Sequence, residues 1–179
     1  MKATGMIRKI DDLGRVVIPK EIRKTLRIRE GDPMEIYVEK NGEIILKRFA
    51  PLGDIVDEVI CLAEVLSKNT GFSVYITDTQ TVIAVSSKAK KNNLDRQISD
   101  ELLEILEERS LFINRGENEI KITEKDGVNT YLSQVISPII SDGDIIGSII
   151  FFSEGTRKNP TETELKMLQV ATDFLSNQM

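Results

Sequence analysis

The side chains best suited to chemistry in this sequence are the guanidinium and ammonium groups near its start. Residues 1–48 hold 12 Lys and Arg against 8 Asp and Glu, a net charge of +4, whereas residues 49–179 hold 12 against 21, a net of −9. Guanidinium groups offer forked N–H donors that suit phosphate oxygens and the O6 and N7 atoms of guanine. The asymmetry predicts a basic part that contacts DNA and an acidic part that keeps the assembly soluble; a simple fluctuation of charge between domains is the alternative.

Other common chemistries lack their side chains. Histidine is absent and Cys61 is the single cysteine, which excludes disulfide frameworks, Cys/His zinc sites and histidine-based catalysis. Asp11 and Asp12 precede Leu-Gly, a pattern more typical of a turn than of a metal pair. No nucleophile and base stand at a recognisable spacing, so we expect neither an enzyme nor a bound metal or cofactor. Cys61 lies in a predicted helix, where the role of a small apolar side chain near the core is favoured over that of a redox-sensing thiol.

The sequence also predicts a cellular compartment. It contains no run of eighteen apolar residues, and the segment MKATGMIRKI carries charges where a signal peptide would be apolar. We therefore expect a cytoplasmic protein that neither spans nor binds a membrane.

The elements that must position the basic side chains follow from local patterns. Residues 6–10 and 15–18 are predicted as short strands around a turn in which Gly14 adopts a positive φ. Pro19 is expected to open a short helix, with Ile22 and Leu26 facing inward and the basic side chains outward.

A hairpin is the strongest local prediction. Residues 34–39 and 44–47 alternate between apolar and polar side chains, and Asn41-Gly42 between them predicts a type I′ turn. Such a unit of about fifty residues holds too few large apolar side chains for a core of its own. We therefore expect it to fold as a dimer, in which strands pair between chains and two half-cores fuse.

The first quarter of the chain has a recognisable sequence. Residues 4–26 read TGMIRKIDDLGRVVIPKEIRKTL, and this segment closely resembles the AbrB family of transition-state regulators. The resemblance implies a swapped-hairpin β-barrel formed by a dimer on double-stranded DNA. It also implies DNA contacts from Arg8, Arg15 and Arg23, with Lys24 at a position that is often arginine. Because lysine lacks the planar fork, we expect Lys24 to contact phosphate, and Lys2, Lys9 and Lys20 to give weaker electrostatic support.

The remaining residues predict an α+β domain with an antiparallel sheet flanked by helices. Apolar spacing predicts helices over 54–69 and 161–178, the latter opened by a Thr161–Glu164 capping box, and a further helix marked by Leu94, Ile98, Leu102 and Ile105. Strands are expected at 72–77, 82–85, 131–140 and 145–152, the last two joined by a turn at 141–144. Gly143 and Gly147 are interpreted as a turn glycine and a strand-packing glycine.

This order of elements resembles a GAF domain, so we expect two domains, 1–50 and 51–179, joined by a short junction at 50–53. The resemblance implies either an unidentified small ligand or a purely structural domain, and it motivates a tetramer formed through the helices 54–69 and 161–178. The combination is similar to forespore regulators that activate some sporulation genes and repress others at the nucleoid. The alternative is an antitoxin that neutralises a toxin and represses its own operon; about 130 residues of globular pattern argue against the disordered tail such proteins carry.

Overall fold

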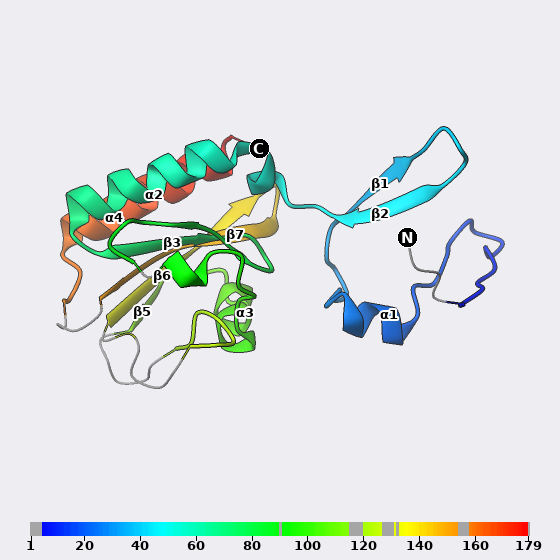
Figure 1. Cartoon of the computed structure of the whole chain (residues 1–179), viewed down its shortest axis with the longest axis horizontal. Coiled ribbons are helices and arrows are strands. Elements are labelled where there is room, and N and C mark those ends of the chain that lie inside the picture. Colours follow the sequence, from blue (N-terminus) through cyan, green and yellow to red (C-terminus); the bar gives the residue numbers. More distant parts are fainter. Residues whose placement is uncertain are drawn as a thin grey trace. The chain divides into compact units, whose positions relative to one another are not determined.

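The chain divides into two compact units, Met1–Arg48 and Phe49–Met179 (Figure 1). The computed structural model describes residues 5–89, 91–114, 120–126, 131, 133–153 and 158–178. We call Met1–Arg48 the N-terminal unit and Phe49–Met179 the C-terminal unit.

The N-terminal unit consists of one short helix and one hairpin. Helix α1 spans Lys20–Thr25, and strands β1 (Met34–Val38) and β2 (Ile44–Arg48) pair antiparallel, with Met34 opposite Arg48 and Val38 opposite Ile44. Pro19 stands just before α1 rather than at its first position, and its carbonyl accepts the backbone N–H of Arg23 at 2.9 Å.

The hairpin forms as predicted, but its turn is of a different type. Type I′ needs a positive φ at both central residues, and of Asn41 and Gly42 only Gly42 has one, at 85°. The Gly42 N–H bonds to the Glu39 carbonyl at 3.0 Å, and the Glu39 N–H bonds to the Glu43 carbonyl at 2.9 Å. The loop is therefore a three-residue turn with a left-handed glycine. The two-residue turn with both φ values positive occurs instead at Asp142-Gly143.

The predicted strands 6–10 and 15–18 do not form within the single chain. The turn between them does, with a bond of 3.0 Å from the Asp11 N–H to the Arg15 carbonyl and a φ of 76° at Gly14. The segments 6–10 and 15–18 on either side of this turn, which we call the two arms, are largely exposed. Nothing in the described part of the same unit covers their apolar side chains. Leu26 is likewise 54% exposed rather than facing inward.

The N-terminal unit has no hydrophobic core of its own. Among residues 5–48, Pro19 is the only buried one, and Ile7, Val17 and Val38 are 88%, 68% and 76% exposed. Isolated apolar side chains at a protein surface are ordinary, but a whole unit with its apolar side chains in water is unstable.

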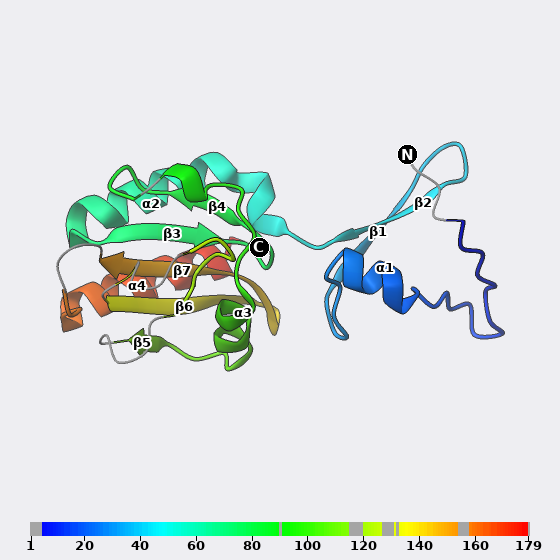
Figure 2. The same ribbon diagram turned by 60° about the horizontal axis from the view of Figure 1, so that its bottom comes forward.

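The C-terminal unit is a five-stranded antiparallel sheet in the order β4-β3-β7-β6-β5, covered by helices on both faces (Figures 1 and 2). In chain order its elements are η1 (Pro51–Ile55), α2 (Val56–Thr70), β3 (Ser73–Thr77), β4 (Val82–Val85), η2 (Lys91–Asn93), α3 (Asp100–Glu107), β5 (Phe112–Asn114), β6 (Ser133–Ser141), β7 (Asp144–Ser153) and α4 (Glu162–Ser176). The predicted α+β class is confirmed.

Alternation along the strands separates two cores. Val74 and Ile76 on β3 and Phe151 on β7 face α2 and α4, whereas their neighbours Tyr75 and Phe152 face α3. Because successive side chains of a strand point to opposite faces, each of these strands contributes side chains to both cores. The C-terminal unit therefore has the packed interior that the N-terminal unit lacks.

The second core contains a polar network. The Asn93 amide donates to the hydroxyl of Tyr75 at 2.9 Å, to Asp126 at 3.2 Å and to the hydroxyl of Tyr131 at 3.4 Å. Burial, with smaller contributions from Tyr75 and Asp126, raises the pKa of Tyr131 well above its ordinary value. The phenol is therefore neutral and serves as a hydrogen-bonding group in this core.

One predicted boundary needs correction. Helix α3 begins only at Asp100, because Ser99 caps it by accepting the Leu102 N–H at 3.0 Å; Leu94 and Ile98 precede it and are not helical. The expected short junction 50–53 includes Leu52, which is fully buried in the core between the sheet and α2. Helix α4 opens with the predicted capping box, in which Glu164 accepts the Thr161 N–H at 2.7 Å; Met179, expected at its end, lies outside the described residues.

Candidate DNA-binding surface

Helix α1 carries three of the predicted DNA contacts. Lys20, Arg23 and Lys24 stand at positions i, i+3 and i+4, which lie on one face of a helix. Lys20 and Lys24 are exposed, whereas Arg23 is half-buried, and its Nε is buried without a hydrogen-bond partner among the described residues. A buried N–H without a partner is costly, so the Nε–H of Arg23 needs an acceptor that the described part of the chain does not supply.

The end of α1 is shaped by a left-handed residue. Arg27 has a φ of 52°, and the N–H of Ile28 reaches back to the Arg23 carbonyl at 2.8 Å while that of Arg27 bonds to the Lys24 carbonyl at 3.3 Å. This pair of bonds is the Schellman arrangement. It ends the helix directly after its basic turn.

Arg48 was not predicted as a site residue, yet it helps to position α1. Its guanidinium on β2 donates to the carbonyls of Leu26 and Arg27 and lies 3.1 Å from the Asp32 carboxylate. These contacts join the end of the helix to the hairpin. They link residues far apart in the chain, and no local pattern reveals such a pair.

The turn of the N-terminal unit holds Arg15 by an ion pair. Its Nε donates to Oδ2 of Asp11 at 2.8 Å, while Oδ1 of Asp11 accepts the backbone N–H of Arg15 at 2.8 Å and of Leu13 at 3.0 Å. The backbone and side-chain hydrogen bonds from Arg15 lower the pKa of Asp11. Asp11 is thus an ionised turn residue, consistent with its predicted role in the turn.

The remaining predicted contacts have simpler surroundings. Arg8 and Lys9 are exposed on the first arm, and within the described part of the chain the guanidinium of Arg8 makes only a long bond of 3.4 Å, to the adjacent Ile7 carbonyl. Lys2 lies outside the described residues. No group of three or more acidic or Cys side chains in the described part of the chain is placed to hold a metal ion.

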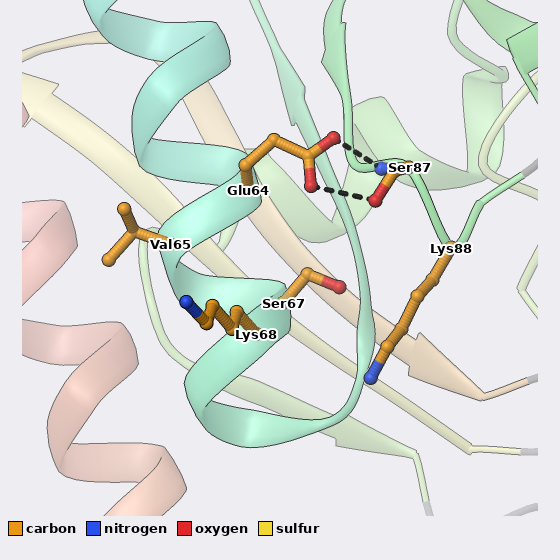
Figure 3. Close-up of a pocket in the computed structure, with 6 residues that line it drawn as sticks. All are labelled: Glu64, Val65, Ser67, Lys68, Ser87 and Lys88. Atoms are coloured by element: carbon orange, nitrogen blue, oxygen red, sulfur yellow. Dashed lines mark hydrogen bonds between the residues drawn. The ribbon is translucent and has the colours of Figure 1, made fainter.

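The C-terminal unit has a shallow pocket between α2 and the loop after β4, of about 340 Å³ (Figure 3). The Glu64 carboxylate accepts the N–H of Ser87 at 2.6 Å and its hydroxyl at 2.8 Å. Ser67 donates its hydroxyl to the Phe72 carbonyl at 2.7 Å. The Glu64 carboxylate and the Ser67 hydroxyl are thus bonded to the protein itself, and the bonds from Ser87 join the loop to α2.

No helix among the described residues has the length and apolar character needed to cross a bilayer.

An exposed cationic helix and turn beside a hairpin, followed by a helix-flanked antiparallel sheet, fit a DNA-binding transcription regulator. Residues 53–179 match the family model described as the C-terminal part of stage V sporulation protein T, a transcription factor, and residues 7–52 match that of the bacterial antitoxin MazE. The chain is 42% identical to stage V sporulation protein T of Bacillus subtilis (strain 168), over all of this chain and 99% of that protein. The chain therefore belongs to the family of stage V sporulation protein T.

Two further relatives cover the separate units. The transition state regulatory protein AbrB of Bacillus subtilis (strain 168) is 49% identical over 69 residues, 35% of this chain and 71% of AbrB. The GAF domain of an Acinetobacter phosphoenolpyruvate-protein phosphotransferase superposes with a TM-score of 0.58 at 10% identity, covering 69% of this chain and 80% of that one. The predicted AbrB-like and GAF-like folds are confirmed, and the second likeness concerns the fold alone.

Proposed function

We propose that this protein recognises operator DNA in the forespore and activates some sporulation genes while it represses others. Residues 1–50 bind the duplex, and residues 51–179 regulate and assemble the protein. The observation that carries the proposal is the exposed basic surface of the N-terminal unit. Its contacts are Arg8, Arg15, Arg23 and Lys24, with support from Lys2, Lys9 and Lys20. The 42% identity to a sporulation protein over the whole chain supports the role in sporulation.

A dimer of the N-terminal unit follows from its exposed apolar side chains. Residues 5–48 bury no apolar cluster, and they contain neither cysteine nor a metal site among the described residues. Pairing the arms 6–10 and 15–18 with those of a second chain supplies the missing strands and core. Two sets of arginines then share one surface on the DNA.

The C-terminal unit supports a tetramer through α2 and α4. These helices contact each other on one face of the sheet (Figure 1). Their outer sides expose Val65 on α2, at 50%, and Val170 and Phe174 on α4, at 61% and 49%. Cys61, expected near the core, is instead exposed. Because residues four apart lie on the same face of a helix, it extends the apolar strip of Val65. Packing two such pairs of helices together removes this strip from water.

Replacing Phe174 with Glu is therefore expected to reduce the intact protein from four chains per particle to two. The new carboxylate would be buried without a partner at the proposed helix interface, while the N-terminal dimer is untouched. Light scattering measures the change. The control is Leu111→Glu, another exposed apolar site in the same unit, at 47%, which should remain tetrameric. A monomeric wild-type protein, or a tetrameric Phe174→Glu variant, contradicts the assembly.

The match of residues 7–52 to an antitoxin family favours one alternative, a protein that also neutralises a toxin. The C-terminal unit weakens it, because residues 53–179 match the transcription-factor family and pack a continuous core instead of a flexible tail. Purification of the protein with the products of neighbouring genes distinguishes the two. A stoichiometric toxin partner would favour the antitoxin.

Regulation through the C-terminal unit is the second part of the proposal. A small ligand held by the GAF-like fold would rotate α2 against α4 and change the spacing of the two N-terminal dimers on DNA. Little chain separates the units, since β2 ends at Arg48 and Leu52 is already buried in the C-terminal core. Coupling of this kind is typically about 1–3 kcal/mol, and DNA must change ligand affinity by the same factor.

A flexible insertion tests this coupling. A Gly/Ser segment of about ten residues between Phe49 and Ala50 leaves Leu52 in its core and each N-terminal dimer intact. We expect unchanged affinity for a duplex with one operator and at least about tenfold weaker binding to a duplex with two, because the effective concentration of the second dimer falls. Fluorescence anisotropy with both duplexes makes the comparison. Equal two-operator affinities of the wild type and the variant count against the coupling.

A further inference from the structure

The Asp11 carboxylate has two separate tasks in the turn of the N-terminal unit. One oxygen, Oδ1, accepts the backbone N–H groups of Leu13 and Arg15, which fixes the turn. The other oxygen, Oδ2, accepts Nε of the Arg15 side chain at 2.8 Å. The same residue therefore organises the backbone and fixes the direction of the guanidinium.

The bond through Nε leaves the recognition edge of Arg15 available. A guanidinium has five N–H donors, and four of them belong to the two Nη groups that form the fork for guanine or phosphate. The side chain of Arg15 is 68% exposed and that of Asp11 34%. An exposed ion pair of this kind contributes little to folding, so a role in stability does not account for it.

Charge alone makes an aspartate here unfavourable for DNA binding. Asp11 and Asp12 are adjacent and exposed beside a side chain that the proposed function assigns to DNA, where each carboxylate repels phosphate. Asp11 binds Arg15 directly through Oδ2, whereas Asp12 is its neighbour without that bond. An arginine that is already held loses less conformational freedom when it binds, and this gain opposes the repulsion.

We propose that Asp11 is a positioning residue for DNA recognition, which holds Arg15 by Nε so that its two Nη groups are presented to the duplex. The inference rests on the proposed DNA contact of Arg15. It separates two neighbouring carboxylates that simple electrostatics treats alike: Asp12 only repels DNA, whereas Asp11 repels it and also orders its contact.

The test compares Asp11→Asn with Asp12→Asn in the full chain. The probes are a duplex obtained by in vitro selection with the wild-type protein and a duplex of random sequence. Asparagine at position 11 retains Oδ1 for the backbone bonds, but its amide nitrogen cannot accept Nε. We expect Asp12→Asn to bind both duplexes as tightly as the wild type or several-fold more tightly. Asp11→Asn should bind the selected duplex about tenfold more weakly, with a smaller preference over the random duplex and an unchanged thermal unfolding midpoint.

A second background separates positioning from a structural role. In an Arg15→Ala protein there is no guanidinium to hold, so adding Asp11→Asn should leave the residual affinity unchanged or raise it. A further decrease in that background, or a lowered unfolding midpoint, would show that Asp11 acts only on the fold and overturn the inference. Equal tightening by Asp11→Asn and Asp12→Asn in the wild-type background also overturns it. If Arg15→Ala alone leaves DNA affinity unchanged, the proposed contact itself fails, and the inference fails with it.

Discussion

Replacing Arg15 with Ala is expected to remove most specific DNA binding while the protein stays folded. A forked arginine contact with guanine contributes about 1–3 kcal/mol, and the proposed dimer would present two copies, so the expected decrease in binding free energy is about 2–6 kcal/mol. Since 1.4 kcal/mol is a factor of ten, affinity should fall by at least about 30-fold. The fold should persist, because the ion pair that the substitution removes is exposed.

Two measurements distinguish a DNA contact from a structural arginine. Fluorescence anisotropy over a series of salt concentrations gives the affinity, and the log-log slope should become shallower by about 0.9 for each phosphate that the variant no longer neutralises. Far-ultraviolet circular dichroism should be unchanged. Arg96→Ala is the matched control, since it removes the same charge from the C-terminal unit and should bind DNA nearly as the wild type does. Loss of secondary structure in Arg15→Ala would show a structural role instead.

Replacing Gly147 with Ala should strongly destabilise the C-terminal unit. A Cβ at this position of β7 would lie 2.0 Å from the carbonyl oxygen of Thr77 on β3 and 2.8 Å from Cδ1 of Leu52. The first neighbour is backbone, so relief requires β3 and β7 to separate at their pairing near Ser148. Overpacking of this kind costs about 3 kcal/mol. The predicted strand-packing role of Gly147 thereby gains a physical cause.

Thermal unfolding measures this effect. For a unit of this size the unfolding midpoint should fall by about 10 °C. Gly53→Ala is the control, because nothing lies within 4 Å of its added Cβ and its backbone is not left-handed. Gly147 lies in the C-terminal unit and the proposed DNA contacts lie in the N-terminal unit, so below the transition the variant should still bind a single operator. An unchanged midpoint would mean that β3 and β7 can accommodate a methyl group between them without cost.

Much of the fold could be predicted because local sequence determines it. The apolar spacing of α2, the capping box of Thr161 and Glu164, and the Asp142-Gly143 turn between two apolar strands act over a few residues each. Such signals depend on backbone geometry and on nearby side chains. The AbrB-like segment also lies in one continuous stretch, so the amino-acid sequence alone identifies the basic residues of the candidate surface.

Boundaries and long-range contacts could not be predicted in the same way. The spacing of Leu94 and Ile98 with Leu102 predicted one continuous helix. Ser99 instead caps α3, so the helix begins at Asp100, after Leu94 and Ile98. The hydrogen bonds from the Arg48 guanidinium to the carbonyls at the end of α1 join residues more than twenty positions apart. Neither feature is evident from local spacing, because each depends on where the chain returns in space.

The sequence by itself determined the family, most helices and strands of the C-terminal unit, and the basic residues that we propose to contact DNA. Only the tertiary structure decided which of them are held and which are exposed. It showed that Asp11 accepts a hydrogen bond from Nε of Arg15, that Leu52 is part of the C-terminal core, and that residues 5–48 bury no apolar cluster. The physical reason is range: secondary structure and turns reflect interactions between near neighbours, whereas burial depends on all the segments that pack around a side chain.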